Sequence, residues 1–303
     1  MNRSARIVVL GEALLDVFPD REVAGGAPFN VARNLAALGA TPLFVSRIGA
    51  GPAGEGILAQ MRRLGMPVHG VQRDRAHLTG RVNVSLRDGQ PVFDIQPDGA
   101  WDWLDAESAA ASVRAARPAL AYFGTLGQRS PRAREAIREC LAATPALRLL
   151  DLNLRGIADE QRIATESLEF ADVLKVNEDE LRALVEWFGS GSHDEAAAAF
   201  ALATRFGLQR IVVTRGEAGW SCYEAHGRQV LEGPSPRVSV VDAVGAGDAF
   251  TAVLLLGELH GWRLPTTLLR AAEFAAAVCK LHGAFDEGST IYADARARWG
   301  RDS

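Results

Sequence analysis

The run of residues with the clearest chemical potential is Val241–Phe250, which contains Gly245, Ala246 and Gly247 directly before Asp248. The apolar stretch that follows predicts a buried helix whose first turn holds these residues. Amides in a first turn lack intrahelical partners and carry partial positive charge, so a polyphosphate can approach a backbone with small side chains. Beside a transferred phosphoryl group, Asp248 would accept the proton of an attacking hydroxyl. The alternative interpretation is a helix-capping acid beside glycines that serve packing.

A second candidate run lies near the N-terminus and begins with the pair Gly25-Gly26. Glycines allow close approach to the backbone, Pro28 suits the first turn of a helix, and Asn30 carries amide donors and an acceptor. In isolation, this run is also typical of an ordinary loop-to-helix start. Gly26 precedes Asp248 by 222 residues, so only the fold can bring the two runs together.

Short β-branched runs alternate with longer helical stretches along most of the chain. This alternation predicts an α/β fold, in which helices cover both faces of a mostly parallel sheet and ligands bind at the carboxyl ends of the strands. The strand candidates are Ile7–Leu10, Pro42–Ser46, Ala119–Phe123, Arg148–Leu152, Asp172–Val176 and Arg210–Thr214. The helix candidates include Phe29–Leu38, Gly54–Leu64, Pro131–Ala142, Glu178–Trp187 and Asp194–Phe206.

Two regions interrupt the alternation with strand-like pieces that pair antiparallel. The first is Leu14–Phe18 followed by Arg21–Ala24. The second is Thr79–Asp94, which predicts two strands around a hairpin turn at Asp88-Gly89. We therefore expect a small separate sheet that covers a site.

A glycine-rich run, Gly49–Gly54, fits GxGxxG after a predicted strand, and Asp74 follows at the distance of a ribose-binding acid. A nicotinamide or flavin enzyme is therefore an alternative. Chance matches are common in a chain with 30 glycines, and Asp74 stands between Arg73 and Arg75. The competing interpretation is a plain strand-to-helix turn followed by a solvated surface ion pair.

Composition restricts the class of protein. The 303 residues are 48% apolar and carry a net charge of −4, which argues against disorder and gives no electrostatic basis for nucleic acid or an anionic membrane as partner. Cys140, Cys222 and Cys279 are widely spaced and odd in number, which favours a reducing cytoplasm. The sequence has no apolar run of membrane-spanning length and no signal-peptide core.

The two glycine-containing runs together resemble the ribokinase-like carbohydrate kinases, the pfkB family, and the resemblance extends over essentially the whole chain. The N-terminal family pattern corresponds to Gly25–Asn30, with Gly39 and Gly49 at the expected spacing. The C-terminal pattern, D-x-x-G-A-G-D, is complete from Asp242 to Asp248. Two patterns so far apart are much more specific than either alone.

This resemblance implies a ribokinase-like fold with three layers, α/β/α, and a mostly parallel central sheet. It implies a single kinase domain, residues 1–303, with a discontinuous β lid formed by about residues 12–26 and 78–96. It also implies an activity, the phosphorylation of a small-molecule sugar by ATP with Mg²⁺. Edge strands of the lid could pair between subunits, so a homodimer is the expected assembly if the chain associates.

The family's roles fall on matching positions of this sequence. Asp248 resembles the catalytic base, and the turn before it resembles the anion hole for the moving phosphoryl group. Asp16 resembles the aspartate that binds sugar hydroxyls, because a carboxylate can accept hydrogen bonds from two hydroxyl groups. The alternative interpretation of Asp16 is a turn residue. The implied catalytic residues are Gly245, Ala246, Gly247 and Asp248, and the implied substrate-binding residues are Asp16, Gly25, Gly26, Asn30 and Arg155.

Three further motifs agree with the resemblance. Asp151–Arg155 resembles D-x-N-x-R, which places Arg155 near phosphate or substrate; a surface ion pair is the alternative. Asn177–Glu180 fits N-x-x-E, in which Glu180 orients a water on Mg²⁺, although acidic helix starts are common. Thr214–Gly219 resembles a nucleotide-binding turn, and no P-loop pattern occurs in the sequence. The implied ATP-binding residues are Asn177, Thr214, Gly216, Gly219 and Gly247.

Departures from the family patterns bear on the cation and the sugar. Many members bind a monovalent cation such as K⁺ with the aspartate at position 242, but Phe285–Ser289 does not match the spacing of the second ligand loop. Ala27 stands where ribokinases carry lysine, which disfavours ribose. The Gly-Gly-Ala-Pro run most resembles bacterial fructokinases, so fructose is the expected acceptor.

Other acceptors and other functions remain open from the sequence alone. Within the family, the alternatives are 2-keto-3-deoxygluconate, ribose or tagatose, and a nucleoside; Arg155 or Arg81 could bind the carboxylate of a sugar acid. Outside it, the alternatives are a nicotinamide-dependent oxidoreductase and a non-catalytic sugar-binding regulator. The complete glycine turn with Asp248 argues against the regulator.

Overall fold

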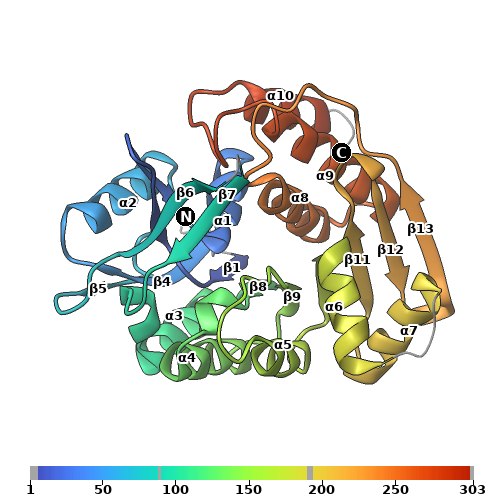
Figure 1. Cartoon of the computed structure of the whole chain (residues 1–303), viewed down its shortest axis with the longest axis horizontal. Helices are drawn as coiled ribbons and strands as arrows, with labels where there is room; N and C mark the ends of the chain where they lie inside the picture. The colour runs from blue at the N-terminus through green and yellow to red at the C-terminus, as the bar shows by residue number, and fades with distance from the viewer. Residues whose placement is uncertain (1–5, 88–89, 190–193, 301–303) are drawn as a thin grey trace.

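The computed structural model describes residues 6–87, 90–189 and 194–300. Within them, the main sheet runs parallel from β5 to β11, and only β12 and β13 pair antiparallel. Figure 1 shows helices around this sheet, which confirms the predicted α/β fold. The sheet order is β13 (Gln229–Gly233), β12 (Trp220–Glu224), β11 (Arg210–Thr214), β10 (Val173–Asn177), β9 (Leu147–Asp151), β8 (Leu120–Gly124), β1 (Ile7–Leu10), β4 (Leu43–Gly49) and β5 (Val71–Asp74).

Alternate residues of the inner strands pack into two separate hydrophobic cores, one on each face of the sheet. Ile7 and Val9 belong to the first core, and Val8 and Leu10 belong to the second. The helices on the first face are α1 (Ala27–Ala37), α2 (Pro52–Arg63), α8 (Ala246–His260), α9 (Leu264–Val278) and α10 (Ile291–Trp299). Those on the second are α3 (Ala106–Ala116), α4 (Pro131–Ala142), α5 (Glu160–Leu168), α6 (Glu178–Phe188) and α7 (Glu195–Phe206). In the described ranges, every helix is too short or too polar to cross a membrane.

A separate four-stranded sheet confirms the predicted antiparallel pieces. Its order is β3 (Glu22–Gly25), β2 (Leu14–Val17), β6 (Gly80–Arg87) and β7 (Gln90–Ile95). The hairpin turn predicted at Asp88-Gly89 lies outside the described residues. Trp101, in the short helix η1 (Ala100–Trp103), packs against Leu14 and Val82 of this sheet. A Cβ at Gly80 would overlap the Trp101 ring, so the glycine allows this contact.

The structure corrects the interpretation of Asp74 as a solvated surface acid. Asp74 ends β5 in a buried position, where its Oδ2 accepts a hydrogen bond from Arg47 Nε at 2.7 Å and lies 3.0 Å from His77 Nδ1. Gly54 packs so closely on the Gly49 carbonyl that a Cβ would overlap it. The GxGxxG run is therefore a tight strand-to-helix turn held by an internal acid.

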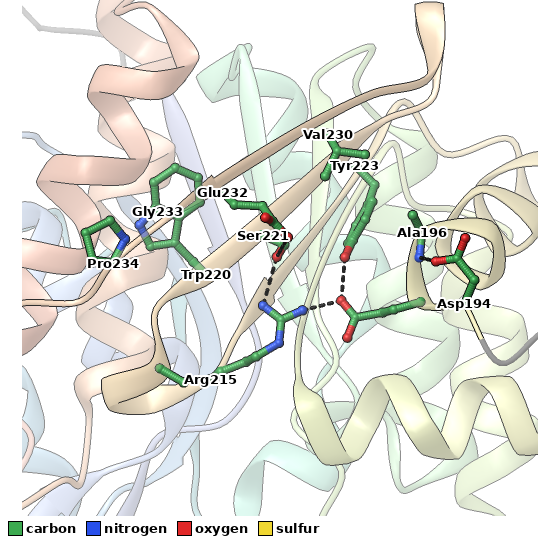
Figure 2. A pocket seen from close by; sticks show the side chains of 12 residues that line it. Asp194, Ala196, Arg215, Trp220, Ser221, Tyr223, Val230, Glu232, Gly233 and Pro234 are labelled. Atoms are coloured by element: carbon green, nitrogen blue, oxygen red, sulfur yellow. Dashed lines mark hydrogen bonds and ion pairs between the residues drawn. The ribbon is translucent and has the colours of Figure 1, made fainter.

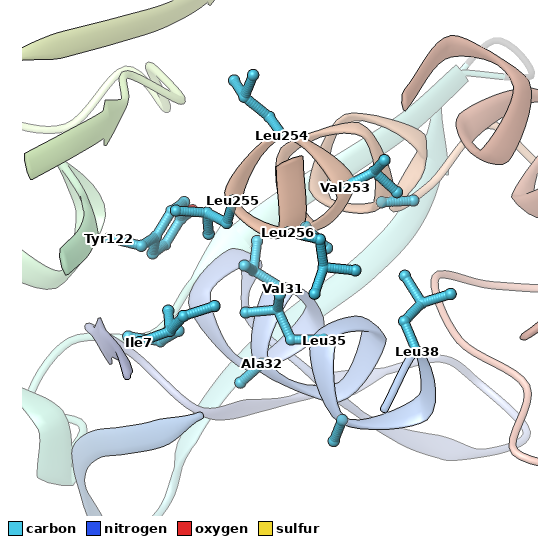
Figure 3. Packing of buried hydrophobic residues seen from close by; sticks show 14 of the residues in the cluster. Ile7, Val31, Ala32, Leu35, Leu38, Tyr122, Val253, Leu254, Leu255 and Leu256 are labelled. Carbon is cyan, nitrogen blue, oxygen red and sulfur yellow. The ribbon is translucent and has the colours of Figure 1, made fainter. Parts of the chain in front are cut away.

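Helices α1 and α8 pack against each other over the first face of the sheet. Val31 and Leu35 of α1 point toward Leu256 of α8, and Tyr122 of β8 lies to one side, next to Leu255 (Figure 3). All five side chains are at most 2% exposed. This contact fixes the N-terminal turns of both helices relative to each other, and those turns carry the two candidate runs.

Truncation of this contact should destabilise the whole fold. Leu35→Ala opens a cavity at a fully buried position, so we expect the free energy of unfolding to fall by about 2–5 kcal/mol. Urea denaturation followed by circular dichroism measures it. Leu269→Ala, at a position that is 45% exposed on α9, is the matched control and should change stability by less than about 0.5 kcal/mol. Equal losses in the two variants would contradict the packing described.

Candidate active site

The first turn of α8 carries the glycine run that precedes Asp248. Gly245 is the N-cap of this helix with φ of 80°, a left-handed conformation that favours glycine. A Cβ on Gly245 would also overlap Ala284 of the C-terminal loop. The Ala246 amide donates weakly to the Ala243 carbonyl at 3.3 Å. The turn therefore presents first-turn amides from a backbone that requires glycine at position 245.

Asp248 lies in the same turn and faces helix α1. Its Oδ2 accepts a hydrogen bond from Asn30 Nδ2 at 2.7 Å, and both side chains are buried. Burial raises the pKa of the Asp248 carboxyl to about 6, while the Asn30 hydrogen bond and the nearby cations Lys175 and Arg155 oppose the rise. The structure thus brings together the two runs that are far apart in the sequence.

The glycine pair at the start of α1 lies beside Asp16. Gly25 pairs with Leu14, and a Cβ on it would overlap the Asp16 carboxylate across β2 and β3. Gly26 is the N-cap of α1 with φ of 103°, and a Cβ there would lie 2.8 Å from the Glu12 carbonyl. Burial raises the pKa of Asp16 to about 6, and Asp248 contributes to the rise. Asp16 and Asp248 are therefore close enough to influence each other.

Arg155 lies on the exposed loop after β9, and its charge lowers the pKa values of Glu12, Asp16 and Asp248. It also lines a hollow of about 850 Å³ between the small sheet, η1 and the start of α4. Asp94, Trp103, Arg129 and Arg132 share this lining. The Arg155 side chain lies 3.4 Å from Asn153 and forms no ion pair among the described residues, so it faces open space beside the acids.

Asn177 and Glu180 form a capping box at the start of α6. The Glu180 amide donates to Asn177 Oδ1 at 2.8 Å, and the Asn177 amide donates to Glu180 Oε2 at 2.8 Å. Glu180 Oε1 accepts a third bond from the Leu154 amide. Burial raises the pKa of Glu180, and Lys175 opposes the rise. A carboxylate with spare lone pairs fits an outer role toward Mg²⁺, which keeps several waters and takes few protein ligands.

The turn after β11 lies next to Asn177, because Asn177 and Thr214 are register partners at the ends of β10 and β11. Gly216 and Gly219 have φ values of 55° and 99°. A Cβ on Gly219 would overlap the Gly233 carbonyl of β13. The turn is therefore held close to the sheet at its carboxyl edge, where α/β proteins bind ligands.

Comparison with known proteins assigns the family. The chain matches the model of the pfkB family carbohydrate kinases over residues 5–289. This chain belongs to that family. It is 32% identical to a fructokinase of Klebsiella pneumoniae over 285 residues, which cover 85% of this chain and 86% of the relative. It is 29% identical to a 2-dehydro-3-deoxygalactonokinase of Haloferax volcanii over 301 residues, 92% of each chain.

A solved structure shows the same fold. The crystal structure of a Xylella fastidiosa fructokinase with bound ATP superimposes with a TM-score of 0.85 and 24% identity, covering 98% of this chain and 99% of that one. The predicted ribokinase-like architecture is thus confirmed. Membership of the pfkB family argues against the nicotinamide oxidoreductase. The close packing of Gly54 on Gly49 explains the GxGxxG run without a dinucleotide.

Asp242, the first aspartate of the family motif, uses both carboxylate oxygens within the fold. Oδ1 accepts from the Val244 amide at 2.9 Å, and Oδ2 accepts from the Gly283 amide at 3.0 Å. Asp242 therefore ties the turn before α8 to the C-terminal loop. A bound K⁺ would have to share a carboxylate that already has these two donors.

A second hollow of about 630 Å³ opens at the start of α7, near β12 and β13 (Figure 2). Arg215 donates to Ser221 at 2.9 Å and pairs with Glu195 there. Tyr223 of this hollow packs in the second core, whereas α8 packs in the first. Arg215 and Ala218 of the predicted nucleotide-binding turn Thr214–Gly219 line it, although none of the individually predicted site residues does. Trp220, which also lines the hollow, packs in the first core, so the hollow borders both faces of the sheet near the edge strand β13.

Two buried ionisable residues next to the site, Lys175 and Glu12, were not predicted from the sequence. Lys175 Nζ lies 3.0 Å from Asp151 Oδ1, and a Cβ on Gly247 would come within 3.1 Å of that nitrogen. Asp151 Oδ2 accepts from the Thr251 hydroxyl at 2.9 Å. Burial raises the pKa of Glu12 to about 7. One feature of the sequence could have drawn attention to Lys175. It is one of two lysines in an arginine-rich chain, and it lies in the next predicted strand after the D-x-N-x-R motif.

Loss of the lysine should destabilise the protein strongly. Lys175→Met leaves the carboxylate of Asp151 buried without its cation, so we expect the free energy of unfolding to fall by about 3–5 kcal/mol in urea titrations at neutral pH. Lys280→Met, which removes the other, exposed lysine, is the control. Replacing the pair together, Lys175→Met with Asp151→Leu, should recover much of the loss. Indistinguishable stabilities for Lys175→Met and the wild type would refute this role of the ion pair.

Proposed function

We propose that this chain is an ATP-dependent sugar kinase that transfers the γ-phosphate of MgATP to a primary hydroxyl of a monosaccharide, with fructose as acceptor. The observation that carries the proposal is the buried Asn30–Asp248 hydrogen bond beside the first turn of α8. It places one carboxylate between the amides suited to a polyphosphate and the glycine pair suited to a close-fitting sugar. Membership of the pfkB family supports the reaction class.

In the proposed reaction, Asp248 acts as the general base. Its oxygen takes the proton of the sugar hydroxyl, while that hydroxyl oxygen forms a bond to the γ-phosphorus. The bond between the γ-phosphorus and the bridging oxygen breaks, and ADP leaves. The amides of Gly245, Ala246 and Gly247 are proposed to stabilise the charge on the moving phosphoryl group.

ATP is proposed to bind along the carboxyl edge of β10 and β11. Asn177, Thr214, Gly216 and Gly219 surround this edge, and Gly247 would face the phosphates. Glu180 is proposed to hold Mg²⁺ through a water, and Asp242 is the candidate ligand for K⁺. When bound, Mg²⁺ would neutralise charge between the β- and γ-phosphates. The ATP bound to the Xylella fructokinase supports the choice of nucleotide.

Fructose is proposed as the acceptor because the chain matches a fructokinase over most of the length of that relative. Asp16, Gly25, Gly26 and Asn30 would hold its hydroxyls. A sugar acid is the second candidate, because the Arg155 side chain faces the hollow without an ion-pair partner among the described residues and could bind a carboxylate. The name of the Haloferax relative agrees with that candidate.

The four-stranded sheet is proposed to act as the lid of a single domain, residues 1–303, formed by about residues 12–26 and 78–96. Closure would exclude water and suppress hydrolysis of ATP. Its edge strands β3 and β7 are available for pairing with a second copy, which supports a homodimer. The free thiols of Cys140, Cys222 and Cys279 support a cytoplasmic location.

A substrate panel tests the proposal directly. ADP release should be fastest with fructose when fructose, 2-keto-3-deoxygluconate, ribose, tagatose and adenosine are compared with MgATP, with and without K⁺. Preference for the keto acid would favour the second candidate. Sugar binding without ADP release from any acceptor would identify a regulator instead of a kinase.

The matched variant for the panel is Asp248→Asn. It keeps the size and the Asn30 contact but cannot take a proton, so kcat should fall by about 10²–10⁴-fold. Asp294→Asn, on the solvent side of α10, is the control. Unimpaired turnover of Asp248→Asn would eliminate the proposed base.

The raised pKa of Asp248 predicts an acid limb in the rate profile. The base works only when ionised, so kcat/KM should fall about tenfold for each pH step of one below about 6. An aspartate with its ordinary pKa would hold the rate constant down to about pH 4. Glu12→Gln, which removes one of the other carboxyls with a raised pKa, should keep the limb. A flat profile to about pH 4.5 in protein that stays folded would contradict the assignment.

A further inference from the structure

Arg33 is a buried arginine that the proposed reaction has not used. It lies one turn after Asn30 on α1 and is 2% exposed. Its guanidinium carbon lies 4.8 Å from the ring centre of Phe29 and 4.9 Å from that of Phe285. One nitrogen donates to Gln60 Oε1 at 3.3 Å, and another donates to Asn30 Oδ1. The side chain is therefore held by three separate parts of the chain.

The contact with Arg33 determines which way the Asn30 amide faces. A guanidinium has only donors, so the atom of Asn30 that contacts it must be the oxygen. The amide nitrogen then points to Asp248 Oδ2, to which it donates at 2.7 Å. The reverse orientation would place two oxygens together at Asp248 and two donors together at Arg33. Arg33 thus fixes Asn30 as a donor to the carboxylate.

The consequence for Asp248 is electrostatic and geometric. A hydrogen bond to the ionised form favours that form, which opposes the effect of burial on this carboxyl. It also occupies Oδ2 and leaves Oδ1 for another partner. The charged groups that act on Asp248 from neighbouring elements are Glu12, Asp16, Arg33, Asp151, Arg155 and Lys175.

We propose that Arg33 is a positioning residue, which acts through the Asn30 amide to keep Asp248 ionised and its Oδ1 directed at the acceptor hydroxyl. The proposal rests on the proposed role of Asp248 as the base. The competing explanation is that Arg33 only packs between Phe29 and Phe285. The two explanations differ in whether the effect of Arg33 requires Asn30.

A double-mutant cycle separates them. Arg33→Met keeps the length of the side chain but loses the donor, and misplacement of a catalytic group typically costs on the order of 10²-fold in rate. We therefore expect Arg33→Met to lower kcat by about 10²-fold and to leave KM for ATP unchanged. In a variant that already carries Asn30→Ala, Arg33→Met should have little further effect on kcat. Arg33→Lys, which keeps a donor, should recover part of the rate.

Independent losses in the double variant, or equal losses in Arg33→Lys and Arg33→Met, would overturn the proposal in favour of packing. Arg134→Met, at a similarly buried arginine of α4, controls for stability. A second readout does not depend on turnover. In carboxyl NMR titrations, Arg33→Met should raise the pKa of Asp248, and an unchanged value would also overturn the proposal. Wild-type protein that shows the Asp248 shift but phosphorylates no sugar would instead refute the proposed function.

Discussion

A single buried hydrogen bond, from Asn30 to Asp248, joins the two chemically informative parts of this chain. An ionised carboxylate in this position loses its hydration, so it needs a donor inside the protein to remain charged. That donor is available only because α1 packs on α8 with the first turns of both helices adjacent. The packing of α1 on α8 in the core thus also determines the geometry of the site.

Besides Arg33 and Arg155, the charged side chains around this bond form two groups. Carboxylates of Glu12, Asp16 and Asp248 lie on the side of the glycine pair, and the Lys175–Asp151 ion pair lies beneath Gly247. An acidic side suits neutral hydroxyl groups, which donate to carboxylates. A side with first-turn amides suits anions. This division explains how one small site would hold both a sugar and a polyphosphate.

The sequence patterns predicted several strands of the main sheet with nearly correct bounds. Ile7–Leu10 and Arg210–Thr214 were predicted with their observed bounds because both are continuous apolar or β-branched runs. β5 was missed because Gln72, Arg73 and Asp74 make up most of it. β13 was also missed, because it is an edge strand with mostly exposed residues and lacks an apolar run. The roles of Lys175 and Arg33 could not be predicted, because each depends on partners from other elements, such as Asp151 or Phe285.

A crystal structure of the protein with fructose and a non-hydrolysable MgATP analogue tests the central claim most directly. We predict that γ-phosphate oxygens lie within about 2.7–3.2 Å of amide nitrogens in the first turn of α8, and that a sugar hydroxyl contacts the Asp248 oxygen not bonded to Asn30. Phosphates bound in the hollow at the start of α7, or a sugar separated from Asp248 by protein, would contradict it.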